Sequence, residues 1–192
     1  MPWNKRSIPA LLVGCFLINA PMTKFYKIAT WADRKHVYAV VETSRGSRAK
    51  LEFNPKLKTF TLSKPLLAGL TYLYDWGFVP STKAEDGDPI DTLIIHDAAT
   101  YPDLVLKCKP IGVLEIVQIT KKNRERNDRI FLIPEQTDIE SELTDVRKLS
   151  KRAKQDLKQF FEATDALDNK KLEFIGWGGP AVATRLINKA SR

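Results

Sequence analysis

The chain has 192 residues, 43% of them hydrophobic and 28% charged, which fits one folded domain with an apolar core and excludes bulk disorder. Its 31 basic and 23 acidic residues leave a net charge of +8, which favours anionic partners such as phosphate compounds, nucleic acid or a membrane surface. Cys15, Cys108, His36 and His96 lack the spacing of a disulfide framework, a zinc site or a nucleophile–base pair. Cys108 is expected in the core, and the two histidines are expected to be structural or exposed.

The N-terminal segment, residues 1–21, is an extension of uncertain role. A basic start, an apolar run over 8–18 and the residues just before Cys15 together resemble a bacterial lipoprotein signal. A proline interrupts the run, which is too short to cross a bilayer as a helix. Met22 offers an alternative start. We therefore expect one domain over 22–192 in a cytoplasmic protein, with no membrane association unless residues 1–21 act as a signal. Export as a lipoprotein through Cys15 is the alternative.

Short runs rich in β-branched and aromatic residues predict a succession of strands. They cover residues 37–42, 50–53, 59–62, 91–95, 105–109, 111–119, 130–133 and 171–175. Asn54 and Pro55 mark the turn of a hairpin, while Pro102, Pro110 and the charged stretch 121–128 separate later strands. So many short strands in succession favour a barrel or a sandwich.

An amphipathic helix is predicted after Pro134, because apolar residues recur at three- and four-residue spacing from Val146 to Phe161. Its other face is basic and lacks interleaved aromatic residues, so a solvated face is expected and no specific nucleic-acid partner. Pro180 is expected near the start of a closing helix. The predicted fold class is α+β, a small antiparallel barrel with flanking helices.

Three carboxylates crowd into six residues at Asp86, Asp88 and Asp91, just before an apolar strand. Gly87 permits a tight turn and Pro89 stiffens it, so the acids can converge on one point. Carboxylates so close repel one another unless they are protonated or share a cation, and oxygen donors suit Mg²⁺, Mn²⁺ or Ca²⁺. The alternative is a solvated acidic turn. The spacing does not fit an EF-hand, whose sixth loop position is glycine.

The segment Asp86-Gly87-Asp88-Pro89-Ile90-Asp91 matches the signature Asp-x-Asp-Pro-x-Asp, and segments at 40–42, 50–52, 72–78, 109–113 and 176–177 agree in order and spacing. On these residues the chain resembles the soluble (family I) inorganic pyrophosphatases, closely from about residue 42 to 134 and thinly beyond. The resemblance implies a five-stranded, OB-like barrel with flanking α-helices. It also implies hydrolysis of inorganic pyrophosphate to two phosphates by metal-activated water, with Mg²⁺ or, in its place, Mn²⁺ as cofactor, in a homo-oligomer.

Carried over residue by residue, the resemblance implies that Asp86 and Asp91 hold Mg²⁺ and that Asp88 accepts a proton from metal-bound water. The further residues implied to hold metal or its outer waters are Glu42, Glu52 and Asn127. Lys50 and Tyr72 are expected to act in catalysis, and the groups expected to contact the phosphates are Lys50, Lys64, Arg129 and Tyr72. Compact polyanions such as pyrophosphate require this kind of charge neutralisation before water can attack.

The chain departs from the family pattern where two acids and a tyrosine–lysine pair are expected. Gln118 and Asn127 stand in place of the acids, and Thr164 and Asp165 in place of the pair. Amide oxygens bring no charge, so weaker metal binding or fewer ions are expected. Asp128 replaces the acid missing at Asn127 only if the chain bulges there. The arginines available to replace the lysine of the missing tyrosine–lysine pair are Arg124, Arg126 and Arg129. The alternative function is a catalytically impaired relative that binds phosphate compounds or another anionic partner.

Overall fold

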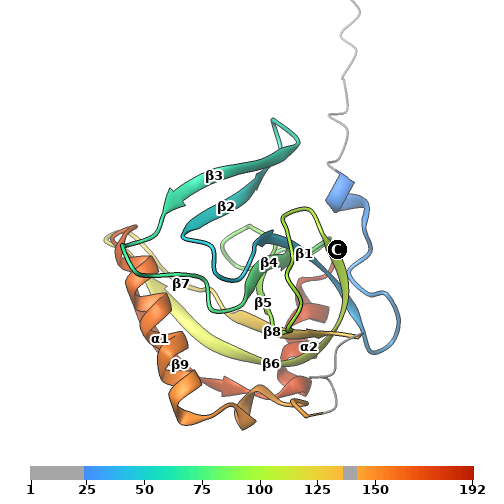
Figure 1. The fold of residues 1–192 in the computed structure, drawn as a ribbon. Helices are drawn as coiled ribbons and strands as arrows, with labels where there is room; N and C mark the ends of the chain where they lie inside the picture. Colours follow the sequence, from blue (N-terminus) through green and yellow to red (C-terminus); the bar gives the residue numbers. More distant parts are fainter. Residues whose placement is uncertain (1–23, 136–141) are drawn as a thin grey trace, which may run out of the picture.

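A ring of five strands forms the centre of the structure, a computed structural model that describes residues 24–135 and 142–192 (Figure 1). In order around the ring the strands are β1 (Val37–Thr43), β4 (Asp75–Val79), β5 (Ile90–Ile94), β8 (Arg129–Pro134) and β6 (Val105–Ile119), and pairing of β1 with β6 closes it. The predicted five-stranded barrel is confirmed. One detail is corrected: β5 and β8 run parallel, whereas the other pairs are antiparallel.

Four further strands extend or flank the ring. The hairpin of β2 (Ala49–Asn54) and β3 (Thr59–Pro65) is a separate two-stranded sheet that stands off the barrel (Figure 1). β7 (Arg124–Arg126) and β9 (Lys171–Gly178) both pair with β6. The sequence predicted the hairpin and β9 but neither β4 nor β7.

Strand β6 is continuous where two strands were predicted. Its 15 residues pass through Pro110, and the register with β8 shifts between Pro110 and Gly112. Such a bulge accommodates a residue that has no backbone N–H to give to the ladder. The proline that was expected to separate two strands therefore bends one long strand around the barrel.

The predicted helix over 146–161 is divided in the structure. Val146–Lys148 form a 3-10 turn, η3, capped by Asp145, and α1 (Lys151–Ala166) begins after Ser150, whose side chain accepts a hydrogen bond from the Ala153 N–H at 3.0 Å. Capping by serine satisfies an otherwise unpaired donor and fixes the helix start. The second helix, α2 (Pro180–Ala190), starts at its proline, as predicted.

The two helices pack against different parts of the sheet and complete two apolar clusters. Leu157, Phe160 and Phe161 on α1 join Tyr72 and Trp76 in the first, and the second lies between the barrel and α2. Cys108 belongs to the second cluster and is fully buried, as expected, and burial raises the pKa of its thiol. Within the described ranges no helix is both long and apolar enough to cross a bilayer.

An aromatic cluster attaches the β2–β3 hairpin to the barrel. Phe25, in the 3-10 helix η1 (Lys24–Lys27), is 1% exposed, and its ring centroid lies 4.8 Å from Phe53, 5.8 Å from Phe60 and 6.0 Å from Phe78. Phe53 and Phe60 belong to the hairpin, and Phe78 belongs to β4. The residues just before the barrel thus hold the hairpin in place.

We predict that a chain beginning at Met22 unfolds at the full-length temperature, whereas one beginning at Ile28 is destabilised. Residues 1–21, with Cys15, lie outside the described residues, so their dispensability remains a prediction. Removing Phe25 empties the middle of the aromatic cluster, and loss of a buried phenylalanine side chain typically costs about 3–5 kcal/mol. Thermal unfolding of both shortened chains measures the difference. Equal unfolding temperatures would show that Phe25 does not hold the hairpin.

A buried carboxylate at the start of β4 joins two loops at one end of the barrel. Asp75 is 1% exposed and accepts hydrogen bonds from the Arg45 N–H at 2.7 Å, the Thr100 hydroxyl at 2.6 Å and His96 Nε2 at 2.5 Å. Burial alone would raise the pKa of Asp75, but the hydrogen bonds from His96, Thr100 and Arg45 outweigh it and lower the pKa. His96 has a structural partner here, as the sequence analysis expected.

Replacing Asp75 with asparagine should therefore destabilise the fold near neutral pH by about 1.5–3 kcal/mol, the usual contribution of a hydrogen bond to a charged group. A carboxyl whose pKa is lowered by folding stabilises the protein above its unfolded pKa, and this contribution is lost as pH falls through the lower folded pKa. The difference between wild type and Asp75→Asn should thus shrink below pH ~4. Urea unfolding at pH 7 and at pH 3.5 tests this, and a pH-independent difference would contradict it.

Candidate active site

One pocket of about 430 Å³ collects all ten residues that the sequence analysis selected. It lies between the β2–β3 hairpin, the acidic loop before β5, strand β8 and the end of α1. The ten are Glu42, Lys50, Glu52, Lys64, Tyr72, Asp86, Asp88, Asp91, Asn127 and Arg129. They come from segments far apart in the chain, and the barrel places them around one space.

The acidic loop is held by hydrogen bonds of the Asp88 backbone. The Asp88 N–H donates to Asp86 Oδ1 at 3.1 Å, and the Asp88 carbonyl accepts from the Ala84 N–H at 2.7 Å. Gly87 has a φ of +94°, a left-handed conformation that glycine adopts without strain. The turn directs Asp86, Asp88 and Asp91 into the same pocket, as the spacing predicted.

The carboxyl groups of this loop bind their protons more tightly than ordinary carboxyls. Burial is the main cause of the raised pKa of Asp86, Asp88 and Asp91. Mutual repulsion adds to it: Asp91 raises the pKa of Asp86, and Asp86 raises that of Asp88. Carboxylates that repel one another in a half-buried pocket are stabilised by a cation placed among them.

Two glutamates face the loop from β1 and β2. Glu42 is 9% exposed, and burial raises the pKa of its carboxyl to about 7 even though its Oε1 accepts a hydrogen bond from the Phe53 N–H at 2.9 Å. Glu52 pairs with Lys50 on the same strand. Burial would raise the pKa of Glu52, but the contact with Lys50 outweighs it and lowers the pKa. Glu52 is thus a charged oxygen donor, whereas Glu42 holds its proton up to about neutral pH.

Two lysines and a tyrosine supply hydrogen-bond donors. Lys50 on β2 is paired across the hairpin with Lys64 on β3, so their side chains are neighbours. Lys64 bridges the pocket to the end of α1, where it pairs with Asp168 and donates to the Thr164 carbonyl at 3.2 Å. Tyr72 is 5% exposed, and burial, reinforced by nearby acids, raises the pKa of its phenol. Tyr72 therefore stays protonated and can donate a hydrogen bond.

Arg129 begins β8 and covers the acidic loop from the opposite wall. Its Nη1 lies 2.5 Å from Asp91 Oδ2 and also donates to Asn127 Oδ1. The guanidinium packs over Trp76, 5.1 Å from the ring centroid, and over Phe161 at 5.8 Å. The contacts place a buried cation directly on one of the three loop carboxylates.

The pocket also contains polar residues to which the sequence analysis gave no positive role. Asp165 and Asp168, at the end of α1, and Lys170, just before β9, line it together with Gln118 and Thr164. Gln118, Thr164 and Asp165 were noted only as departures from the family pattern. Asp168 and Lys170 carried no signal, because an Asp-Asn-Lys turn after a helix is typical of an exposed loop.

Three predicted substitutes for the missing groups lie elsewhere. Arg124 pairs with Glu173 at 2.6 Å, and Arg126 pairs with Asp128 at 2.8 Å and with Glu115 at 3.0 Å. Asp128 also accepts the Ile116 N–H, which turns its carboxylate away from the pocket that Asn127 lines. Of the three arginines proposed as replacement cations, Arg129 alone lines this pocket.

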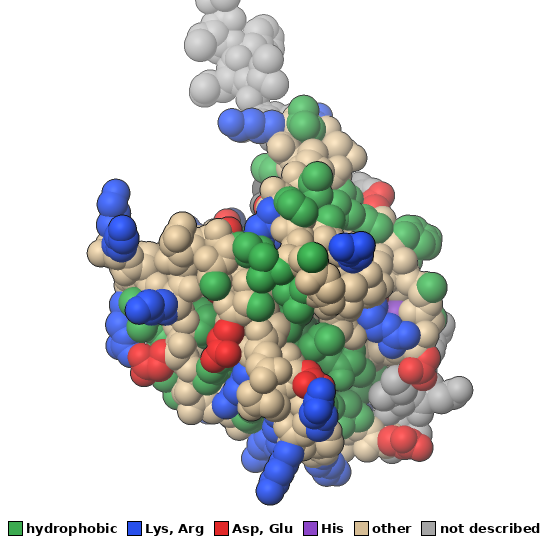
Figure 2. All heavy atoms as spheres, turned by 60° about the vertical axis from the view of Figure 1, so that its left-hand side comes forward, with side chains coloured by type: hydrophobic (Ala, Val, Ile, Leu, Met, Phe, Trp, Pro, Cys, Tyr) green, Lys and Arg blue, Asp and Glu red, His purple; other side chains and the backbone are tan. Residues whose placement is uncertain are grey.

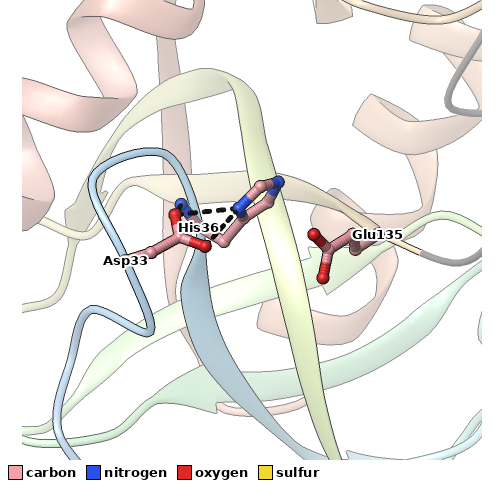
Figure 3. Close-up of side chains that lie close together, drawn as sticks. All are labelled: Asp33, His36 and Glu135. Atoms are coloured by element: carbon pink, nitrogen blue, oxygen red, sulfur yellow. Dashed lines mark hydrogen bonds and ion pairs between the residues drawn. The ribbon is translucent and has the colours of Figure 1, made fainter.

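A second group of side chains could in principle hold a metal ion. Asp33 and His36, just before β1, lie close to Glu135, just after β8, and Asp33 Oδ1 lies 2.9 Å from His36 Nδ1 (Figure 3). Lys107 Nζ lies 2.9 Å from Asp33 Oδ2 and 2.8 Å from Glu135 Oε2. Its ammonium already takes the position of a cation between the two carboxylates, so this cluster is a structural ion-pair network.

The basic face of α1 is divided by acids and aromatic contacts. Arg152 pairs with Asp156 at 2.8 Å, while Lys154 and Lys158 lie over the rings of Trp177 and Phe174. Figure 2, which brings the α1 side of Figure 1 forward, shows basic side chains scattered over this face with acidic ones among them. The pattern is that of a solvated helix surface, as predicted.

Comparison with known proteins gives one consistent result. The family model for inorganic pyrophosphatase matches residues 39–192. The inorganic pyrophosphatase of Synechocystis is 30% identical over 141 residues, which are 73% of this chain and 81% of that protein. The inorganic pyrophosphatase of Halobacterium salinarum is 30% identical over 155 residues, which are 80% of this chain and 85% of that protein. The solved inorganic pyrophosphatase from Thermus thermophilus matches with a TM-score of 0.76 at 27% identity, covering 86% of this chain and 95% of that one. The matched residues include every side chain selected for the pocket.

Proposed function

This chain belongs to the inorganic pyrophosphatase family and hydrolyses inorganic pyrophosphate to two phosphates, and we propose that the pocket described above is where it does so. The observation that carries the proposal is the convergence of all ten selected residues on that one pocket. Asp86, Asp88 and Asp91 face Lys50 and Arg129 across it. A pocket that combines carboxylates able to hold metal ions with cations able to contact phosphate suits the hydrolysis of a compact polyanion.

The acidic side of the pocket fits divalent metal ions. Its donors are carboxylate oxygens, which suit Mg²⁺ and Mn²⁺. Burial raises the pKa of Asp86, Asp88 and Asp91, so a cation among them would stabilise their charged forms. We assign Mg²⁺ as the natural ion, with Mn²⁺ as a replacement, held by Asp86, Asp91, Glu42 and Glu52. When bound, such ions supply positive charge to the phosphates and lower the pKa of water.

The remaining residues have roles that their positions support. Asp88 accepts the proton of the attacking water, because its carboxylate lies at the open side of the loop and its pKa is raised. Lys50, Lys64 and Arg129 neutralise the phosphate groups, and Tyr72 donates a hydrogen bond to one of them. Lys64 shares its ammonium with Asp168, so an incoming phosphate must compete with that ion pair.

The direct experiment is phosphate release from pyrophosphate by the purified full-length chain. We expect turnover with Mg²⁺, turnover with Mn²⁺, and none above background when EDTA removes both. Binding of pyrophosphate without phosphate release under any of these conditions would overturn hydrolysis and leave an anion-binding relative. Turnover that persists in EDTA would overturn the role assigned to metal ions.

Two properties of the whole molecule belong to the same proposal. We infer a homo-oligomer in the cytoplasm, with no specific nucleic-acid partner. Light scattering during size-exclusion chromatography measures the mass of the assembly, and a monomer would contradict the first inference. Labelling cells with a lipid precursor tests the alternative, which is export as a lipoprotein through Cys15. A labelled chain would contradict the cytoplasmic location.

A further inference from the structure

A chain of polar contacts crosses the wall of the pocket opposite the acidic loop. It begins at Asp91, whose Oδ2 lies 2.5 Å from Arg129 Nη1, and the same Nη1 donates to Asn127 Oδ1. Asn127 Nδ2 donates to Gln118 Oε1 at 3.0 Å, and Gln118 Nε2 donates to Asp165 Oδ1 at 2.6 Å. Two aspartates thus terminate a chain that contains one arginine and two amides.

The groups in this series of contacts fix the direction of each of its hydrogen bonds. An arginine can only donate, so the oxygen of Asn127 faces Arg129 and its amide nitrogen faces Gln118. The oxygen of Gln118 receives a second donor, Lys170 Nζ, at 3.3 Å. Both lone pairs of that oxygen are therefore engaged. A metal ion at Asn127 Oδ1 would stand beside the guanidinium and be repelled by it.

Arg129 is held so firmly that it cannot easily make room for a metal ion. Its side chain is 5% exposed and lies between Asp91 and the rings of Trp76 and Phe161. Among the described residues, its Nε is the one buried side-chain nitrogen or oxygen without a hydrogen-bond partner. The side chain keeps this position although one donor stays unpaired, which indicates that the contacts of Nη1 and the two rings determine it.

The two walls of the pocket therefore differ in what they can hold. Among the described residues, Asp86, Asp88 and Glu42 have no cation within ion-pairing distance, and Glu52 on the same side pairs with Lys50. Asp91, in contrast, already carries a positive charge on one oxygen. Divalent ions should therefore bind on the side of Asp86 and Glu42, because Arg129 already neutralises the charge of Asp91 on the other side.

We propose that the Arg129 guanidinium is a permanent cation on Asp91, so that the wall formed by Gln118, Asn127 and Arg129 takes no divalent ion. The metal ions of the site are confined to the opposite side, where they are held by Asp86, the two glutamates and the oxygen of Asp91 that does not contact Arg129. This inference rests on the proposed function, in which the pocket binds divalent ions. It replaces the sequence-based expectation that Asn127 is a metal ligand.

The test counts Mn²⁺ bound per chain, by the loss of the electron paramagnetic resonance signal of free Mn²⁺, without pyrophosphate. Arg129→Gln should bind one more Mn²⁺ than wild type, or bind an existing ion at least 10-fold more tightly. Lys64→Gln is the matched control, because it removes one positive charge from the same pocket but not from Asp91. It should keep the wild-type number. An unchanged Arg129→Gln, or equal gains in both variants, would overturn the proposal.

A second variant keeps the proposal testable if Arg129→Gln fails to fold. Asn127→Asp places a new carboxylate beside Arg129, and the guanidinium should neutralise its charge. The number of bound Mn²⁺ ions should therefore equal that of wild type, and their affinity should stay within about 2-fold of it. If a metal ion did bind on this wall, Asn127→Asp would give it a charged ligand. Mn²⁺ binding that is 10-fold or more tighter than in wild type would therefore overturn the proposal. Because no step of the assay requires turnover, its outcome is independent of whether pyrophosphate is hydrolysed.

Discussion

Replacing Asp88 with asparagine should lower the turnover of pyrophosphate by about 10²- to 10⁴-fold, the usual cost of losing a general base. An asparagine cannot accept the proton of the attacking water. Burial, reinforced by the charges of Asp86 and Glu52, raises the pKa of Asp88, so its carboxylate is a stronger base than an ordinary aspartate. Steady-state phosphate release with saturating Mg²⁺ measures the loss.

The fold and the loop should survive this substitution. The backbone N–H and carbonyl of Asp88 hold the turn, and asparagine provides both. Thermal unfolding and Mn²⁺ binding should therefore stay close to wild type. Glu85→Gln is a suitable control, because it removes a similar negative charge three residues away, from a side chain that does not line the pocket. If Asp88→Asn keeps more than a tenth of the activity, another group acts as the base.

The acidic loop could be predicted from the sequence because its chemistry is local. Asp86, Asp88 and Asp91 lie within six residues, and Gly87 has the positive φ that the turn requires. Lys50, Tyr72 and Arg129 were found differently, through the order and spacing of segments that resemble a known family. No local pattern distinguishes these three from ordinary surface or core residues.

The contacts around Gln118 could not be predicted because they depend on where α1 ends relative to β6. Asp165 meets Gln118 across 47 residues, and Lys170 meets it across 52. Strand β4 was missed for another reason. All five of its residues are buried, so it lacks the alternation that marks a half-exposed strand. β7 was missed because its three residues, Arg-Glu-Arg, are charged and typical of a loop.

At Gly77 two strands of the barrel approach so closely that only glycine fits. Gly77 on β4 pairs with Val41 on β1, next to Glu42 on one strand and Trp76 on the other. A Cβ added at Gly77 would lie 1.9 Å from the Val40 carbonyl oxygen and 2.9 Å from its carbon. Both are backbone atoms of a paired strand, so no side chain can move aside to relieve the clash.

Gly77→Ala should therefore destabilise the protein by about 4 kcal/mol or more, in the range of the most damaging single substitutions. Separation of β1 from β4 would also move Glu42 and Trp76, so activity should fall with stability. Gly176→Ala is the control, since Gly176 is also in a strand and no atom lies within 4 Å of its added Cβ. That variant should unfold within about 1 kcal/mol of wild type. Urea unfolding followed by tryptophan fluorescence compares the two, and equal midpoints would show that β1 and β4 can separate without disrupting the barrel.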